Sequence, residues 1–146
     1  MIKKKILIFG CGSVGAHHAN AAIRNKYKVF ITDVNKGQFL ILKNKLYPSR
    51  YGKWDRSICF INYKKILSLK NYFDLIVIGS SPKSHIEIFK KIYKKLKYKK
   101  ILIEKPLCVY NQSKEFSKYK LNNVFCGFNH SISPSIRKVF KIVNKK

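Results

Sequence analysis

A glycine-rich stretch near the N-terminus has the composition and spacing of a phosphate-binding loop. Gly10, Gly12 and Gly15 form a GxGxxG motif, with Ser13 and Val14 between the last two glycines. The first glycine permits a tight turn, the second lets a pyrophosphate approach the backbone, and the third lets a helix pack closely on a strand. A helix that begins at such a loop directs free N–H groups and the positive end of its dipole toward an anion. The stretch therefore predicts a site for the pyrophosphate of a dinucleotide.

An acidic residue follows the glycines at the distance expected for a ribose contact. Asp33 comes directly after an apolar stretch and 18 residues beyond Gly15. A carboxylate at this position can accept hydrogen bonds from a ribose diol. It would also repel a 2′-phosphate, so the sequence favours NAD as the cofactor over NADP.

The segments around the motif supply the context that makes it specific. We predict a strand over residues 4–9, a helix from the glycines to about residue 26, and a second strand over 27–32 that ends at Asp33. A strand, a glycine loop, a helix, a second strand and an acid form the full dinucleotide-binding fingerprint. The alternative is a glycine-rich turn in an α/β protein that binds no nucleotide.

Apolar and polar stretches continue to alternate through the rest of the chain. The pattern predicts a helix over 34–46 with Asn35 as its N-cap, a loop over 47–55 and a helix from Ser84 to residue 96. The other predicted strands are 57–60, 74–78, 100–103 and 124–126, and the other predicted helices are 62–70, 111–120 and the C-terminal segment after Pro134. Such alternation indicates right-handed crossovers and an α/β doubly wound parallel sheet of about six strands, in one domain spanning 1–146.

Three further loops fall at the carboxyl edge of this predicted sheet, where ligands of such folds bind. They contain Ser80, Ser81, Pro82 and His85 after the fourth strand, Glu104, Lys105 and Pro106 after the fifth, and Gly127, Asn129, His130 and Pro134 after the sixth. Together with the glycine loop, these motifs resemble the N-terminal domain of the Gfo/Idh/MocA oxidoreductases, the family of glucose-fructose oxidoreductase and inositol dehydrogenase. The resemblance runs from about Ile6 to the end of the chain, and its most distinctive element is Glu-Lys-Pro directly after a buried strand.

The resemblance implies a role for each loop. Lys105 matches the family's active-site lysine, which lies beside the nicotinamide and the substrate hydroxyl and assists proton transfer as hydride moves. Glu104 would hold this lysine in place, and Pro106 would stiffen the turn through a cis peptide. The implied catalytic residue is Lys105, and the implied cofactor-binding residues are Gly10, Gly12, Ser13, Val14, Gly15, Asp33, Ser80, Ser81, Pro82, His85, Glu104 and Asn129.

Each of these assignments has a structural alternative. Lys105 is one of 28 lysines, and His85 falls in the first turn of a predicted helix, where a structural or solvated role is common. Asn129 has the alternative of a simple turn residue. His17 and His18 are expected to be structural or surface residues, although His18 matches a common family position.

The sequence departs from the family pattern in two places. Ser131 and Ile132 follow the Asn-His pair, where the family often has an arginine, which leaves substrate contacts at that loop open. Family members also have a second, α+β domain that supplies most of the substrate pocket, and this chain is expected to end where that domain would begin. The resemblance therefore implies a cofactor-binding domain that cannot by itself enclose a sugar.

Composition narrows the remaining choices. The net charge of +26 is the difference between 32 basic and 6 acidic residues, and the basic residues are 28 lysines and only 4 arginines spread along the chain. This composition favours a solvated lysine surface over a polyanion-binding one, because proteins that read nucleic-acid grooves rely on arginine. Four scattered cysteines (Cys11, Cys59, Cys108 and Cys126) show no metal-ligand spacing and are expected to be free thiols, without a redox role for Cys11. No apolar run suits a membrane span and no signal peptide is apparent, so we expect a cytoplasmic protein.

The favoured hypothesis is an NAD-dependent oxidoreductase, or its cofactor-binding part, that transfers hydride between nicotinamide and a sugar, inositol or nucleotide-sugar. The expected partners are a small polyol or sugar substrate and a second copy of the chain or another chain that supplies the substrate domain. One alternative is a non-catalytic NAD-binding module or partner-dependent subunit. The other is a basic domain that binds nucleic acid or another polyanion, whose affinity would fall steeply with salt. No metal is expected.

Overall fold

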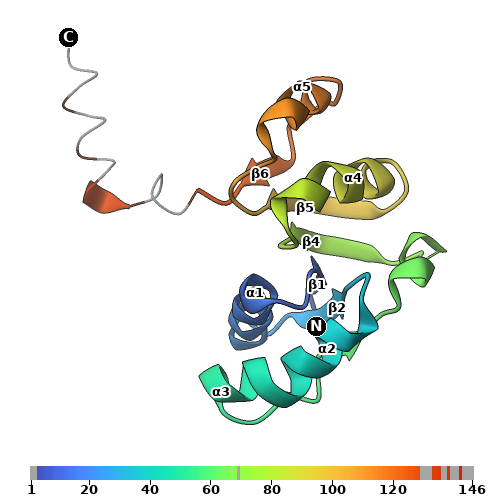
Figure 1. Cartoon of the computed structure of the whole chain (residues 1–146), viewed down its shortest axis with the longest axis vertical. Helices are drawn as coiled ribbons and strands as arrows, with labels where there is room; N and C mark the ends of the chain where they lie inside the picture. The colour runs from blue at the N-terminus through green and yellow to red at the C-terminus, as the bar shows by residue number, and fades with distance from the viewer. Residues whose placement is uncertain (1–2, 69, 129–132, 136–137, 139–141, 143–146) are drawn as a thin grey trace.

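The structure, a computed structural model, describes residues 3–68, 70–128, 133–135, 138 and 142. In these residues six parallel strands form one sheet, in the order β3-β2-β1-β4-β5-β6 (Figure 1). The strands are β1 (Lys5–Phe9), β2 (Lys28–Thr32), β3 (Cys59–Phe60), β4 (Tyr72–Ile78), β5 (Lys97–Ile103) and β6 (Val124–Cys126). This order is that of a Rossmann fold, so the predicted doubly wound sheet is confirmed.

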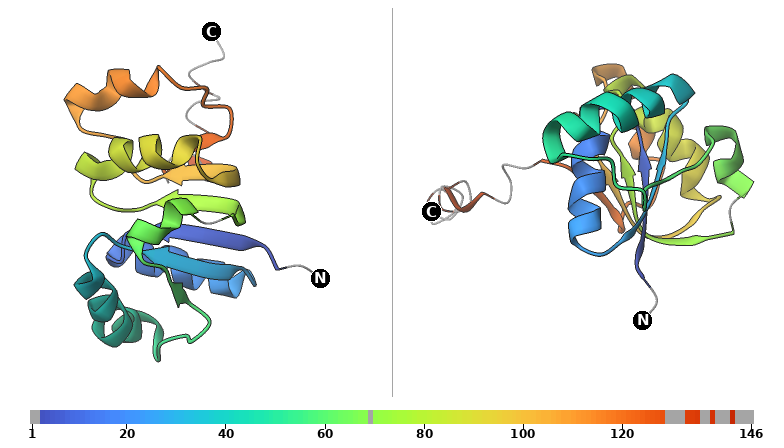
Figure 2. Two further views of the ribbon diagram at one scale, coloured as in Figure 1. Left: turned by 90° about the vertical axis from the view of Figure 1, so that its right-hand side faces the viewer. Right: turned by 90° about the horizontal axis from the view of Figure 1, so that it is seen from below.

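Helices cover both faces of the sheet (Figure 2). They are α1 (Ser13–Arg24), α2 (Lys36–Ile41), the π-helical turn η1 (Leu42–Leu46), α3 (Tyr47–Tyr51), the 3₁₀ helix η2 (Tyr63–Ser68), α4 (Pro82–Tyr93), the 3₁₀ turn η3 (Tyr110–Gln112) and α5 (Ser113–Phe116). No helix in the described part of the chain is long and apolar enough to cross a bilayer.

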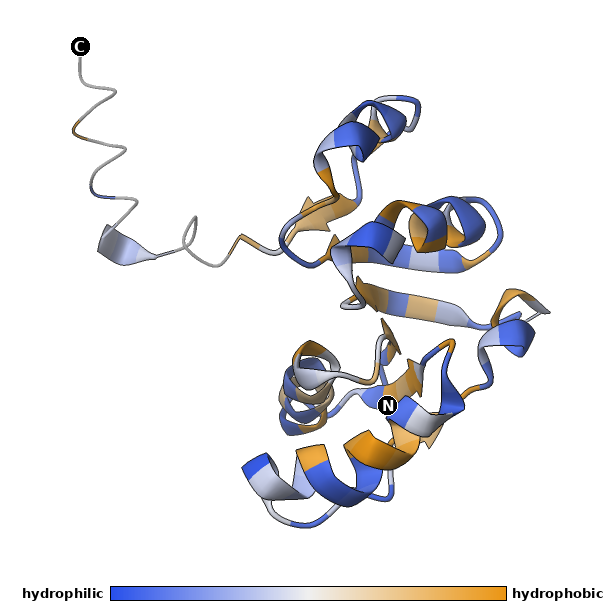
Figure 3. Ribbon diagram, in the orientation of Figure 1, coloured by the Kyte–Doolittle hydropathy of each residue, from blue (hydrophilic) through white to orange (hydrophobic). Residues whose placement is uncertain are grey.

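Two apolar cores form, one on each face of the sheet. Alternate side chains of β1 point to opposite faces, so Leu7 and Phe9 join the core beneath α4, while Ile6 and Ile8 join the core beneath α1. The sequence pattern predicts Ile88, Phe89, Ile92 and Leu96 as inward-facing, and all four are buried, together with Ile86 of α4. The hydropathy colouring of Figure 3 shows the apolar strands between the helices.

The register of the sheet brings the loops together at one edge. Phe9 pairs with Thr32 on one side and with Ile78 on the other, and Ile78 pairs with Ile103. Because all the strands are parallel, the residues that follow these positions emerge at the same edge. The glycine loop, Asp33, and the loops after β4 and β5 are therefore neighbours.

The predicted loop over 47–55 is wrong in its first half. The chain continues through η1 into α3 and remains helical to Tyr51. Pro48 lies in the first turn of α3. Tyr47, only 3% exposed, anchors this short helix in the core beneath α1.

Several predicted boundaries also change. The Asn35 side chain caps α2 by accepting the Gly37 N–H at 2.8 Å, which confirms the predicted N-cap. The N-cap of α4 is Ser81 rather than Ser84, since Pro82 fits the first helical position. Strands β4 and β5 begin earlier than predicted because Tyr72 pairs with Lys97. The helix predicted over 111–120 ends at Phe116, and most of the predicted C-terminal helix lies outside the described residues.

Candidate functional site

The glycine loop makes a close contact at one end and leaves an open space at the other. Gly10 has φ +109°, a conformation that side chains rarely adopt, and a Cβ on Gly15 would lie 1.9 Å from the Gly10 carbonyl oxygen. A Cβ on Gly12 would instead meet no atom within 4 Å. Gly12 is the N-cap of α1 and gives it no side-chain cap, and the first turn of α1 holds no acidic residue. The start of α1, where Ser13 and the 37%-exposed Val14 lie, is thus an uncapped, accessible helix N-terminus.

Asp33 fixes the two loops on either side of it. Its Oδ2 accepts the backbone N–H of Cys11 at 2.8 Å, and its Oδ1 accepts the N–H of Asn35 at 2.9 Å. The side chain is only half-buried, and each carboxylate oxygen can accept more than one hydrogen bond. Asp33 therefore holds the glycine loop while it keeps acceptor capacity for a ligand.

Cys11, inside the glycine loop, is a buried and neutral thiol. It is 1% exposed, and its burial, followed by the charge of Asp33, raises its pKa to about 12. The thiol therefore stays protonated at physiological pH and adds no negative charge beside the uncapped helix.

We expect Cys11 to resist modification in the native protein. At pH 8 the other three cysteines, which are all partly exposed, should react with a thiol reagent such as DTNB while Cys11 stays unmodified. Peptide mass mapping after a short exposure measures this, and the unfolded protein in guanidinium is the control in which Cys11 should react as well. Rapid native labelling of Cys11 would contradict the buried placement.

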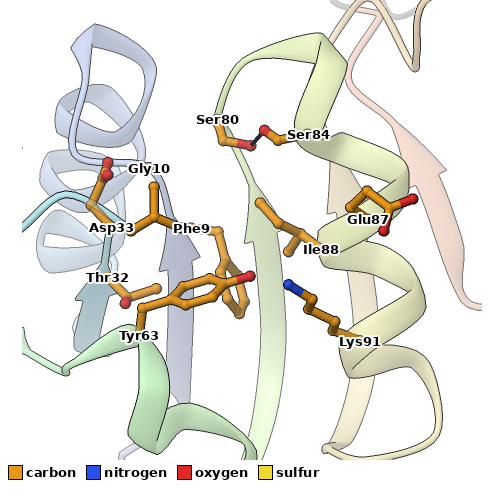
Figure 4. A pocket seen from close by; sticks show the side chains of 11 residues that line it. Phe9, Gly10, Thr32, Asp33, Tyr63, Ser80, Ser84, Glu87, Ile88 and Lys91 are labelled. Atoms are coloured by element: carbon orange, nitrogen blue, oxygen red, sulfur yellow. Dashed lines mark hydrogen bonds between the residues drawn. The ribbon is translucent and has the colours of Figure 1, made fainter.

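A pocket of about 180 Å³ lies beside Asp33, between the ends of β1, β2 and β4 and the first turns of α4 (Figure 4). The hydroxyl oxygen of Thr32 is buried there and has no hydrogen-bond partner among the described residues. Across the pocket, the Lys91 ammonium lies 5.7 Å from the centre of the Tyr63 ring. The pocket is lined by Phe9, Gly10, Thr32, Asp33, Val34, Tyr63, Ser80, Ser84, Glu87, Ile88 and Lys91. The sequence pointed to only Gly10, Asp33 and Ser80 in this set.

His85 ties the loop after β4 to the loop after β5. The ring is fully buried, with Nε2 2.9 Å from the Ser80 carbonyl oxygen and Nδ1 3.1 Å and 3.2 Å from those of Pro106 and Leu107. A side chain with no exposed surface cannot touch a ligand in this conformation. The structure therefore gives His85 the structural role that the sequence left open, holding two loops of the site together.

The remaining residues of the β4 loop are arranged around the start of α4. Ser81 is the N-cap and is exposed, Pro82 is the first helical residue, and the Ser80 hydroxyl lies 2.8 Å from that of Ser84 (Figure 4).

Glu104 links the loop after β5 to α1. Its Oε1 lies 2.7 Å from His18 Nε2, and its Oε2 accepts the Lys105 N–H at 3.3 Å. A Cβ on Gly127 would lie 3.1 Å from the Glu104 carboxylate, so the β6 loop also packs on this side chain. The Lys105–Pro106 peptide is cis. His18, for which the sequence gave no specific contact, is thus what connects the glycine-loop helix to the Glu-Lys-Pro segment.

Lys105 itself is exposed at this edge. Within the described part of the chain its ammonium has no carboxylate within ion-pair distance. Asn129 lies outside the described residues, so its proposed position near the nicotinamide stays a prediction. Among the described residues no group of three or more His, Cys, Asp and Glu side chains could hold a metal ion.

Comparison with known proteins gives one family match. The family model described as "Oxidoreductase family, NAD-binding Rossmann fold", GFO_IDH_MocA, matches residues 4–120. No curated protein is significantly similar to the chain in sequence.

Solved structures show the same fold. Myo-inositol 2-dehydrogenase from Lactobacillus plantarum aligns with a TM-score of 0.69 and 24% identity, over 98% of this chain and 41% of that one. Myo-inositol dehydrogenase from Lactobacillus casei, in complex with NAD(H) and myo-inositol, aligns with a TM-score of 0.74 and 16% identity over 98% and 42%. UDP-N-acetylglucosamine 3-dehydrogenase from Acidithiobacillus ferrooxidans aligns with a TM-score of 0.69 and 16% identity over 97% and 44%. The chain thus spans about two fifths of the length of these proteins.

Proposed function

The chain belongs to this oxidoreductase family with an NAD-binding Rossmann fold, and we propose that it binds NAD and takes part in hydride transfer to or from a sugar, inositol or nucleotide-sugar. The observation that carries the proposal is the uncapped N-terminus of α1, open above Gly12 and flanked by the Asp33 carboxylate. The proposed substrate class is supported by similar structures, one a complex with NAD(H) and myo-inositol and another a UDP-N-acetylglucosamine dehydrogenase.

The residues present fit a dinucleotide. The space that a Cβ on Gly12 would occupy is empty, which suits a pyrophosphate close to the backbone N–H groups of Ser13 and Val14. The pocket of about 180 Å³ beside Asp33 is lined by the backbone of Gly10, the carboxylate of Asp33 and the hydroxyl of Ser80, which suit the hydroxyl groups of a ribose. We place the adenosine half of the cofactor in this pocket, between Asp33 and Ser80.

Asp33 is the proposed determinant of cofactor preference. Its half-buried carboxylate would accept hydrogen bonds from the hydroxyls of the adenine ribose while it continues to hold the N–H groups of Cys11 and Asn35. A 2′-phosphate at the same place would meet this negative charge, so we propose NAD rather than NADP as the cofactor.

Lys105 is the proposed catalytic residue. A bound nicotinamide supplies or accepts the hydride. The Lys105 ammonium would stabilise the negative charge that develops on the substrate oxygen and hold the proton that moves with it. The bonds of Glu104 to His18, and of His85 to the backbone of Ser80 and Pro106, fix the loop that carries the lysine. The loop after β4, with Ser81 and Pro82, is proposed to lie along the cofactor.

Titration with NADH, followed by its fluorescence, tests the proposal. Asp33→Ala should weaken binding about tenfold to a hundredfold, since hydrogen bonds to a charged group contribute roughly 1.5–3 kcal/mol. Asp74→Ala is the matched control. Asp74 is also a half-buried aspartate that accepts a backbone N–H, that of Lys5 at 2.8 Å, but it lies near the opposite edge of the sheet. Asp74→Ala should therefore leave the NADH affinity unchanged.

Two outcomes would contradict the proposal. One is the absence of NADH binding to the wild-type chain at millimolar concentration, and the other is an equal affinity of wild type and Asp33→Ala. The cofactor preference is tested by measuring the affinities of wild type and Asp33→Asn for NADH and for NADPH. Asp33→Asn removes the negative charge, so the difference between its two affinities should be smaller than in wild type.

A further inference from the structure

A basic side chain from α3 reaches the start of the glycine-loop helix. The Nη1 atom of Arg50 lies 2.6 Å from Ser13 Oγ and 3.4 Å from the Ser13 carbonyl oxygen, although 37 residues separate the two in the chain. Ser13 is the first residue of α1 and follows Gly12, above which the structure is open. The guanidinium of Arg50 therefore lies at the edge of the uncapped helix N-terminus.

Packing between α3 and α1 holds Arg50 in this place. The Tyr47 side chain is buried, and its hydroxyl donates to Asn20 Oδ1 on α1 at 3.4 Å. Tyr51 contacts His17 edge to face, with ring centres 5.8 Å apart, and its hydroxyl is hydrogen-bonded to His17 Nδ1. His17 Nε2 in turn lies 3.1 Å from Arg50 Nη1. Because a guanidinium only donates, Nε2 accepts, and the His17 proton lies on Nδ1.

The charge of Arg50 is not paired with any Asp or Glu side chain among the described residues. All six acidic residues of the chain are described, and none of their carboxylates makes an ion pair with Arg50. The acceptors that Arg50 does contact, on Ser13 and His17, are neutral. A guanidinium has five N–H donors, so donors remain for an external anion.

We infer that Arg50 is a cofactor-binding residue that donates to the pyrophosphate of the dinucleotide, an inference that rests on the proposed function. Arg50 contacts Ser13, the first residue of the helix whose N-terminus would attract the anion, and a planar guanidinium suits phosphate oxygens. Arg50 thus adds a fixed positive charge to a loop whose own residues contribute only backbone N–H groups and the hydroxyl of Ser13.

The experiment compares full-length wild type, Arg50→Gln and Arg56→Gln. Arg56 is the control, because it is an exposed arginine of the loop that follows α3. Affinities for NADH, NADPH, ADP and adenosine are measured by direct titration or by competition with NADH, and thermal unfolding checks that each variant is folded.

Arg50→Gln should weaken NADH and ADP by a similar factor, about tenfold to a hundredfold, because a charge-assisted hydrogen bond is lost. The affinity of Arg50→Gln for adenosine, which has no phosphate, should stay within about twofold of the wild-type value. Arg56→Gln should bind all of these ligands with wild-type affinity. Arg50→Lys should recover part of the loss.

Three results separate the possible failures. Wild type that binds no NADH would overturn the proposed function itself. Wild type that binds NADH, with Arg50→Gln equal to it for both NADH and ADP, would overturn the role of Arg50 alone. A loss confined to NADPH would place the guanidinium at a 2′-phosphate instead, and would also overturn the inference.

Discussion

Gly15→Ala is expected to destabilise the domain by at least about 3 kcal/mol, while Gly12→Ala should leave its stability almost unchanged. A methyl group on Gly15 would lie 1.9 Å from the Gly10 carbonyl oxygen, and only a shift of the backbone can relieve that contact. Overpacking typically costs 1–3 kcal/mol and more where backbone must move. For a chain of this length, about 3 kcal/mol corresponds to a fall in the melting temperature of about 10 °C.

For cofactor binding we expect the larger effect from Gly12→Ala. A methyl group on Gly12 meets no protein atom within 4 Å, so Gly12→Ala should fold normally. It would however occupy the space that the pyrophosphate needs, and the NADH affinity should fall by about a hundredfold.

Thermal unfolding by circular dichroism and NADH titration of both variants measure this pair of effects. A Gly12→Ala variant that binds NADH as tightly as wild type would contradict the placement of the pyrophosphate.

Lys105→Met is expected to lower the rate of hydride transfer by about a hundredfold to a thousandfold, with NADH affinity within about threefold of wild type. The reason is that the ammonium is proposed to act on charge that exists only while the substrate oxygen is losing or gaining its proton. The exposed Lys105 side chain supports no part of the core, so the variant should remain folded.

The measurement is the appearance of NADH from NAD with a panel of polyols that includes myo-inositol, together with the NADH affinity. Lys99→Met is the matched control, since Lys99 is also an exposed lysine but lies within β5, away from the carboxyl edge. Lys105→Arg should retain more activity than Lys105→Met because it keeps the positive charge. A turnover rate of Lys105→Met within fivefold of the wild-type rate would contradict the assignment of Lys105 as catalytic. If wild type binds NADH but turns over none of the polyols, a non-catalytic NAD-binding module would be favoured.

Local patterns in the sequence were sufficient for the fold and for the first part of the site. The alternation of apolar runs with amphipathic stretches predicts a parallel sheet, because strands covered on both faces are apolar throughout. The glycine spacing and Asp33 could be identified because their roles depend on backbone geometry within a single strand–helix–strand unit. Glu104 and Lys105 stood out because they follow a buried strand. Their roles remain predictions, as does the role of Asn129.

Other parts of the site depend on contacts that no local pattern encodes. His85 meets Pro106 across 21 residues because β4 and β5 are neighbours in the sheet. His18 meets Glu104 across 86 residues because the strand before α1 and β5 are separated only by β4. A histidine has the same local pattern whether it is solvated or buried, so the sequence left both open.

Arg50 is the clearest example of a site residue that local sequence patterns did not predict. Its segment has a proline, a serine and a glycine and was predicted as a loop, yet burial of Tyr47 against the core makes it helical. The sequence by itself determined the sheet, the anion-binding loop and the acid beside it, since each is set by residues close together in the chain. Only the tertiary structure decided which distant side chains surround that loop and its helix, because strand order and helix packing bring Arg50, Glu104 and Tyr63 there from separate segments.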